Sequence, residues 1–301
     1  MSRNAALLAG GFVCAVLLPA PESRAFCRVT TTTDPNQQAC ATDGVPLEWR
    51  RRCISFSVDA RGSQTMAFDD VVDAIDRSFA TWAAVECDGQ AIDLEVARTE
   101  EFALCQQAQF NDRGPNVNTV AFLSPFEDAK GVPYTPEALA LTILTRFDDG
   151  EIVDADMLIN EDMTPHTDCP DGGCVATPGA QAAIDLENII THEAGHFFGL
   201  GHSDVVESTM LFLSPRGEVS KRTLAQDDID GLCTIYPPGS VGGGCDFAPR
   251  GGLQVEDCRV EAEDGGGCSA HIGADGSPIW ASLLGLVVVA LLRRRAREGA
   301  M

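Results

Sequence analysis

The sequence predicts an α+β fold, because runs of alternating apolar residues occur together with two segments of helical character. The runs are short and are bounded by polar or turn-forming residues, as in the strands of a packed sheet. They lie at Ile54–Val58, Ile92–Val96, Thr119–Leu123, Leu141–Phe147 and Ile152–Ile159. An amphipathic helix is expected over about residues 67–84, where four apolar side chains recur at helical spacing: Val71, Ile75, Phe79 and Trp82.

The first two runs read as half-buried strands, and the last two as a hairpin. Asp148-Asp149-Gly150 separates the last two runs and has the composition of a tight turn. Trp82 could line a site, but its place in the helical pattern favours packing in the core. The second helix is expected to begin near Ala182 or Asp185, with Glu187 in its first turns, where the helix dipole favours acids.

This second helix carries the most informative stretch of the chain, which runs from His192 to His202. His192 and His196 are four residues apart, so a helix places them on one face, where two imidazoles can hold a zinc ion. Glu193 lies beside them as a candidate general base. Gly199 lets the chain leave the helix, and His202 returns as a third ligand. An open fourth position would make this a catalytic rather than a structural zinc site.

The alternative is a helix with ordinary surface histidines. The chain has only five histidines, and three of them fall at ligand spacing. The extended motif also fixes five positions, which chance rarely matches. The pattern therefore favours the metal site. His166 and His271 remain, too few for a second zinc site, so His166 is expected to be a lone loop histidine.

The first 25 residues are typical of an export signal. Arg3 gives a positive start, an apolar stretch follows from Ala5 to Leu18, and Ala25 is the small residue at which signal peptidases cleave. The mature chain is then expected to begin at Phe26. Export brings the protein into an oxidising environment, where cysteines pair.

Eleven cysteines remain after the signal, which contains Cys14. Disulfides are expected to tie down the N-terminal segment 26–52, which holds Cys27 and Cys40. Three further loops could be closed locally, although spacing alone does not determine partners. These are Cys87 with Cys105, Cys169 with Cys174, and Cys245 with Cys258.

The chain changes character after Tyr236. Residues 238–267 are polar and rich in glycine, which predicts a flexible linker. In the tail 268–301, an apolar run from Ile279 to Leu292 precedes an arginine cluster. The run is shorter than the roughly 20 residues of a spanning helix, but it could be extended by its flanks. Membrane attachment, transient or stable, is the expectation.

The net charge of −24 argues against nucleic acid as a partner, because phosphates would be repelled. Acidic side chains also raise the question of structural calcium. Four aspartates near the hairpin offer oxygen ligands, but they do not follow the spacing of a known calcium loop: Asp148, Asp149, Asp154 and Asp156. A solvated turn is the alternative.

The stretch His192–His202 resembles the metzincin metallopeptidases, with Met210 at the place of their methionine turn. Ser203 is similar to the matrixin branch of that group. So is the segment Leu224–Leu232 followed by Tyr236, which resembles the final helix of matrixin catalytic domains. The resemblance covers about residues 50–237. The tail, with a Gly-Cys site at Cys268, resembles bacterial MYXO-CTERM sorting tails, which implies processing near that cysteine.

The matrixin resemblance implies a metzincin catalytic domain over residues 53–237. Its expected form is a twisted, mostly parallel five-stranded sheet on two long helices, with a small C-terminal lobe carrying a third helix. The family's inhibitory cysteine peptide and the histidines of its structural zinc are missing. Leu211-Phe212-Leu213 also replaces the usual Tyr-Pro after Met210. Asp227 and Asp228 are interpreted as structural acids in the first turn of the last helix.

The predicted function is an exported zinc endopeptidase, located at the cell surface or outer membrane, or secreted after processing. His192, His196 and His202 would bind zinc, and Glu193 would act as general base on protein or peptide substrates. An edge strand in the Ala140–Ile159 region would align the substrate. We expect a monomer. The alternative is a catalytically inactive surface binding or adhesive protein on the same scaffold, against which the presence of Glu193 argues.

Overall fold

A computed structural model describes residues 26–33, 40, 42–163, 165–241 and 243–253. The predicted export signal at 1–25 and the predicted tail at 268–301 lie outside these residues, as does Cys258. Within the described ranges, no helix has the length and apolar character needed to cross a membrane.

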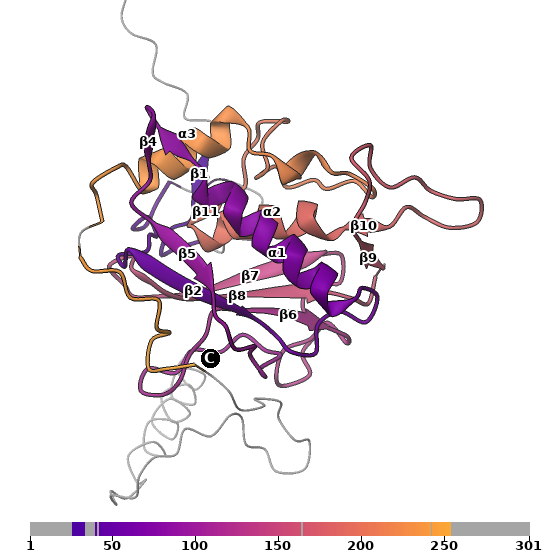
Figure 1. Ribbon diagram of the computed structural model, residues 1–301, viewed down its shortest axis with the longest axis horizontal. Helices are drawn as coiled ribbons and strands as arrows, with labels where there is room; N and C mark the ends of the chain where they lie inside the picture. Colours follow the sequence, from indigo (N-terminus) through magenta and orange to yellow (C-terminus); the bar gives the residue numbers. More distant parts are fainter. Residues whose placement is uncertain (1–25, 34–39, 41, 164, 242, 254–301) are drawn as a thin grey trace, which may run out of the picture. The chain divides into compact units, whose positions relative to one another are not determined.

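A mixed five-stranded sheet lies at the centre of the domain, with the strand order β5-β2-β6-β8-β7 (Figure 1). The first four strands in this order run parallel, and β7 is antiparallel to β8. This confirms the mostly parallel sheet and the hairpin. β7 is an edge strand. The bounds are β2 Cys53–Val58, β5 Glu95–Arg98, β6 Thr119–Leu123, β7 Ala140–Arg146 and β8 Ile152–Asn160.

Two details of the strand prediction are wrong. β5 begins at Glu95 rather than Ile92, because Ile92 and Leu94 are core residues in the approach to the strand. β2 is buried along its whole length rather than half-buried. Ser57 on this strand satisfies its hydroxyl within the domain, where Oγ donates to the Glu101 carbonyl at 3.0 Å and accepts the Ala103 N–H at 2.9 Å.

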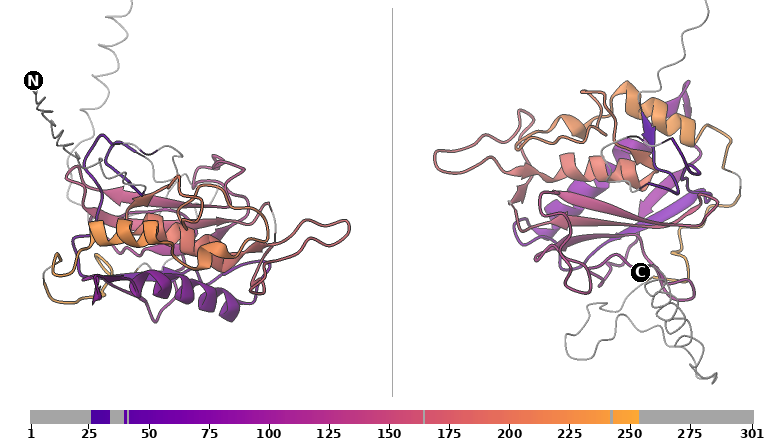
Figure 2. Two further views of the ribbon diagram at one scale, coloured as in Figure 1. Left: turned by 90° about the horizontal axis from the view of Figure 1, so that it is seen from above. Right: turned by 180° about the vertical axis from the view of Figure 1, so that it is seen from behind.

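Helices α1 (Phe68–Ala83) and α2 (Leu186–Phe197) lie next to each other over one face of the sheet (Figures 1 and 2). The apolar side of α1 is buried as predicted. Its Trp82 belongs to the core, and the indole Nε1 donates to the Thr191 carbonyl of α2 at 2.8 Å. The Phe79 ring stacks on Phe56 of β2 with 3.9 Å between ring centroids. Core packing thus fixes α2 against both α1 and the sheet.

A third helix, α3 (Gln226–Ile235), follows the histidine motif. Tyr236 at its end is fully buried, and its hydroxyl donates to the Phe198 carbonyl and accepts from the Trp49 N–H, both at 3.0 Å. A separate C-terminal lobe around α3 stays a prediction. The short elements are β1 Cys27–Arg28, β3 Glu86–Cys87, β4 Gln90–Ala91, β9 His166–Thr167, β10 Ile184–Asp185, β11 Leu200–Gly201 and the 3₁₀ turn η1 Ser220–Arg222.

The disulfide Cys169–Cys174 confirms one of the three expected local pairs, and the disulfide Cys27–Cys40 ties down the N-terminal segment as expected. The other two expectations are wrong. Cys87 pairs with Cys233 of α3, and Cys245 pairs with Cys53 of β2. These bonds span 146 and 192 residues, and sequence spacing carries no signal for such contacts.

The early part of the predicted linker is bound to the domain. Cys245 holds it to β2, and the carbonyl groups of Arg250 and Gly252 accept hydrogen bonds from Asn116 at 3.1 and 2.8 Å. Side chains with little apolar character can therefore be ordered here, because a disulfide and backbone hydrogen bonds replace a hydrophobic core.

The four aspartates considered for calcium do not form one cluster. Asp149 is exposed and pairs with Arg50 at 2.7 Å. Asp154 and Asp156 are buried next to each other on β8, and burial raises the pKa of both, that of Asp156 to about 7. The groups of three or more candidate ligands among the described residues include none of these aspartates. Calcium thus stays a prediction with no site assigned.

The prediction that His166 lies in a loop is wrong. It lies in β9, which pairs with β10 directly before α2, and only 2% of its surface is exposed. Neither ring nitrogen has a hydrogen-bond partner in the described part of the chain. Burial therefore lowers the pKa of His166 to about 4 from the ordinary 6.5.

We expect His166 to make folding sensitive to acid. A histidine whose pKa is lower in the folded than in the unfolded protein favours the folded state. This contribution to stability is fully present above the pKa of the unfolded state, near 6.5, and is lost as the pH falls toward 4. When the pH is lowered from 8 to 5, the wild type should lose about 2 kcal/mol more of its free energy of unfolding than the His166→Leu variant loses. Urea unfolding with excess chelator measures this. Equal losses in both proteins would contradict it.

Candidate metal centre

Helix α2 positions the first two histidines. Its N-cap is Asp185, whose carboxylate accepts the Asn188 N–H at 2.8 Å. All residues of α2 are buried, and the His192 and His196 rings lie one turn apart with their centroids 4.9 Å from each other. The spacing of four residues thus produces the shared face that the sequence predicts.

The third histidine depends on Gly199. Its φ of 92° is a conformation that glycine adopts at low cost, and a side chain here would also meet the Leu47 carbonyl at 2.8 Å. The turn leads into β11, which pairs with β1 of the N-terminal segment. This pairing holds the chain just before His202.

The three histidines fit a zinc ion. The Nε2 atom of His202 lies 3.2 Å from the Nε2 atoms of both His192 and His196. The expected separation is about 3.3 Å for ligands at Zn–N distances near 2.0–2.1 Å in tetrahedral geometry.

The second ring nitrogens support this fit. His192 Nδ1 bonds to the Thr209 carbonyl at 2.7 Å, and His196 Nδ1 bonds to the Leu200 carbonyl at 2.8 Å. A carbonyl only accepts, so each Nδ1 carries the proton and each Nε2 presents a lone pair. Burial also lowers the pKa of both rings, that of His196 to about 3, which keeps them neutral.

Glu193 lies against the edge strand. One carboxylate oxygen accepts the hydroxyl of Thr142 on β7 at 2.6 Å, and the same hydroxyl lies 3.1 Å from the Glu193 carbonyl. Burial raises the pKa of Glu193 to about 7, against the Thr142 hydrogen bond and the charge of Lys221. A carboxylate with such a pKa can both take and release a proton near neutral pH. The sequence pattern did not identify Thr142, since a strand threonine carries no motif.

Met210 packs beneath the histidine helix. A Cβ placed on Gly195 would lie 2.1 Å from the Met210 sulfur and 2.9 Å from Trp82, so only glycine leaves room for both. The Met210 carbonyl also accepts the Ser203 N–H at 2.9 Å. The turn around Met210 therefore contacts both α2, which carries His192 and His196, and Ser203, which follows His202.

We expect Gly195→Ala to destabilise the domain by about 1–3 kcal/mol, because Met210 or Trp82 must move out of a packed position. Chemical denaturation would measure this. The control is Gly172→Ala, since Gly172 is exposed and an added Cβ there meets nothing within 4 Å. A loss no larger than that of the control would show that Met210 adapts without cost.

Asp228 is buried and anchors the Met210 turn to α3. Its carboxylate accepts the Ser208 hydroxyl at 2.5 Å, the Thr209 N–H at 2.8 Å and the Ala225 N–H at 2.8 Å. Thr209 in turn provides the carbonyl that orients His192. The interpretation of Asp228 as a structural acid is correct in kind, but the helix dipole is only part of the reason. Asp227 accepts the Ser203 hydroxyl at 2.6 Å.

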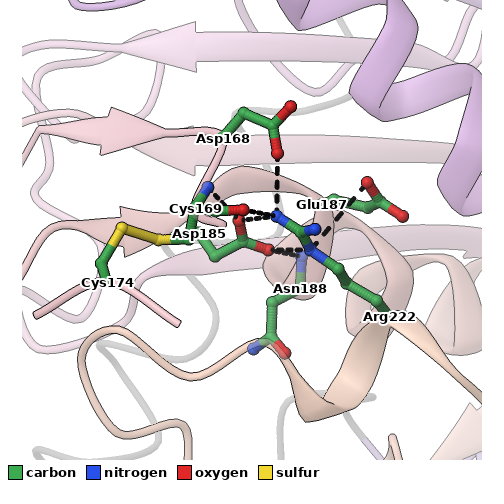
Figure 3. The surroundings of a disulfide bond; sticks show 7 residues. All are labelled: Asp168, Cys169, Cys174, Asp185, Glu187, Asn188 and Arg222. Atoms are coloured by element: carbon green, nitrogen blue, oxygen red, sulfur yellow. Dashed lines mark hydrogen bonds and ion pairs between the residues drawn. A yellow bond between two sulfur atoms is a disulfide. The ribbon is translucent and has the colours of Figure 1, made fainter. Parts of the chain in front are cut away.

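A cluster around Arg222 fixes the start of the histidine helix to the segment after Met210 (Figure 3). The Arg222 guanidinium bonds to both carboxylate oxygens of Asp185 at 2.5 and 2.8 Å, and to Asp168 and the Cys169 carbonyl at 2.8 Å. The disulfide Cys169–Cys174 adjoins this cluster, and the Cys174 N–H donates to the Gly217 carbonyl at 3.0 Å. The disulfide-closed turn thus braces the loop that follows Met210.

That loop begins with the residues that depart from the family pattern. The Phe212 ring meets the ring of His202 edge-on at 5.1 Å and remains 44% exposed, while Leu213 is 64% exposed. Apolar surface therefore borders the metal-binding histidine His202.

The family assignment follows from a comparison with known proteins. The model of the matrixin peptidase family matches residues 48–237. This match covers the sheet, the three helices and the histidine motif. The chain belongs to the matrixin family. Matrixins are zinc enzymes, so the family and the geometry of the three histidines agree.

Individual matrixins are similar over shorter stretches. Metalloendoproteinase 2-MMP of Arabidopsis thaliana is 38% identical over 96 residues, which is 32% of this chain and 23% of that protein. Metalloendoproteinase 1-MMP of the same plant is 42% identical over 59 residues, 20% of this chain and 16% of that protein. Human matrix metalloproteinase-25 is 44% identical over 54 residues, 17% of this chain and 10% of that protein. The chain thus matches at most about a quarter of the length of these relatives.

Proposed function

We propose that this matrixin is an exported zinc-dependent endopeptidase, with His192, His196 and His202 as the zinc ligands. The single observation that carries the proposal is the convergence of three Nε2 atoms beside a buried carboxylate, with that of His202 lying 3.2 Å from those of His192 and His196. Zinc bound there would polarise a peptide carbonyl and acidify water. A site built only for binding would not require the adjacent carboxylate.

In the proposed reaction Glu193 is the general base. It takes a proton from the attacking water and delivers it to the leaving amine. Thr142 holds the carboxylate in place through its 2.6 Å hydrogen bond, and the buried surroundings exclude bulk water. His192 and His196 are oriented by the Thr209 and Leu200 carbonyl groups, so the reacting groups are arranged before a substrate binds.

The substrate is proposed to lie along the edge strand. Among the residues that the structure describes, β7 has a strand neighbour on only one side, so its other edge can pair with an extended peptide. Thr142 connects this strand directly to Glu193, which would bring the paired peptide next to the base. Phe212 and Leu213 offer apolar contacts for substrate side chains.

Export is proposed from the sequence signal at 1–25 and from the chemistry of the folded domain. The described residues contain four disulfides, which persist in oxidising surroundings. Attachment through the tail 268–301 and processing near Cys268 belong to the same proposal, with protein or peptide substrates as partners and the chain acting as a monomer.

The test is cleavage of casein or a peptide library, with products identified by mass spectrometry. We expect chelator-sensitive cleavage that is lost in His202→Ala and retained in His166→Leu, a matched change at a buried histidine outside the site. Cleavage that resists chelation, or that survives in His202→Ala, would contradict the proposal. Metal binding without any cleavage would favour the binding-protein alternative.

A further inference from the structure

Lys221 places a positive charge against His192, one of the three metal-binding histidines. It lies in η1, and its N–H donates to the Asn188 side chain of α2 at 2.8 Å. Its side chain is 3% exposed, and the ammonium donates to the Leu211 carbonyl. The Nζ atom is 3.4 Å from His192 Nδ1. The backbone and the head group are thus both held, which fixes the charge in place.

The charge of Lys221 is not neutralised locally. In the described part of the chain, the contacts of Nζ are the Leu211 carbonyl and the His192 ring, and no carboxylate lies within 4 Å. The ring offers no lone pair at Nδ1, because that nitrogen donates to Thr209. Lys221 therefore brings its ammonium group against a zinc ligand without accepting a hydrogen bond from it or donating one to it.

The same ring would separate this cation from the metal. Nδ1 faces Lys221, and Nε2 faces the point where the three histidines converge. The ammonium group and a bound zinc ion, separated by one imidazole ring, would repel each other strongly in this buried site. Dissolved salt would screen this repulsion little. The repulsion opposes metal binding while the geometry of the ligands favours it.

We propose that Lys221 is a positioning residue of the metal centre whose ammonium lowers the affinity of the three histidines for zinc. This rests on the proposed function, from which it takes zinc as the metal and the activity and export of the protein. A weakened site releases its metal more readily, so activity would respond to the zinc concentration around the exported protein. Lysine is scarce in this chain: Lys130 and Lys221 are the only two among 301 residues.

The test compares the zinc affinity of the purified full-length protein with that of charge variants. Lys221→Met removes the charge, and Lys221→Gln removes it while retaining a donor for the Leu211 carbonyl. Competition with a chromophoric chelator at pH 7 should show zinc binding about tenfold tighter or more in both, with slower release. Lys130→Met, a change at the exposed lysine, is the matched control and should leave the affinity within about twofold.

Folded neutral variants with unchanged or weaker zinc affinity would overturn the proposal and leave Lys221 a purely structural role. Tighter binding in Lys221→Gln alone would still support it, because Lys221→Met also removes the hydrogen bond. The two proposals can fail separately. A wild type that binds zinc but cleaves no peptide contradicts the peptidase function alone, whereas a wild type that binds no zinc contradicts both.

Discussion

Glu193→Gln is expected to lose peptidase activity by about three orders of magnitude while it keeps its zinc. The amide has nearly the same shape as the carboxylate and can still accept the Thr142 hydroxyl, so the site should remain assembled. It cannot take a proton from water, and general base catalysis contributes roughly 10²–10⁴-fold to a rate. The measurement is kcat/KM on a peptide substrate, together with metal content by elemental analysis.

The control for this variant is Glu187→Gln on the same helix. Glu187 is also largely buried, but it pairs with Arg77 at 2.7 Å rather than facing the histidines. Its neutral variant should keep activity within about threefold. A Glu193→Gln enzyme that cleaves at the wild-type rate would remove Glu193 from the mechanism, and a loss of zinc would reassign it to metal binding.

Asp228→Ala is expected to destabilise the domain by about 4 kcal/mol. The substitution leaves the buried Thr209 N–H and the partly buried Ala225 N–H without their acceptor, and each such group costs roughly 1–3 kcal/mol. It should also weaken zinc binding, because Thr209 provides the carbonyl that orients His192. Denaturant unfolding of the metal-free protein separates the first effect from the second.

Asp227→Ala is the matched control, one residue earlier in the same helix. Asp227 is more exposed and its carboxylate accepts the Ser203 hydroxyl, so a loss of about 1 kcal/mol or less is expected. If the two variants were equally stable, Asp228 would not be the anchor of the turn around Met210.

Periodic signals in the sequence predicted most of the scaffold. Val71 to Trp82 predicted the buried side of α1, and the spacing of His192 and His196 predicted their common face. Gly199 predicted the turn that returns His202. In each case the geometry is set by residues close together in the sequence, so a local sequence pattern is enough to predict it.

The errors concern contacts between distant segments. Cys87 pairs with Cys233 within α3, and Cys53 pairs with Cys245 beyond it; no local pattern encodes these contacts. His166 looked like a loop residue because its burial depends on β10, which lies 18 residues later in the chain. The roles of Thr142 and Lys221 arise where a strand and a 3₁₀ turn meet α2, and neither residue belongs to a motif.

The central claim is that three histidines and one carboxylate form a single zinc-dependent hydrolytic site. Titration of the metal-free protein with zinc tests this most directly when bound zinc and peptide cleavage are followed together. We predict that cleavage is absent without zinc, rises in proportion to bound metal and reaches its maximum at one zinc per chain. Cleavage before zinc is added, or a full site that cleaves nothing, would contradict the account.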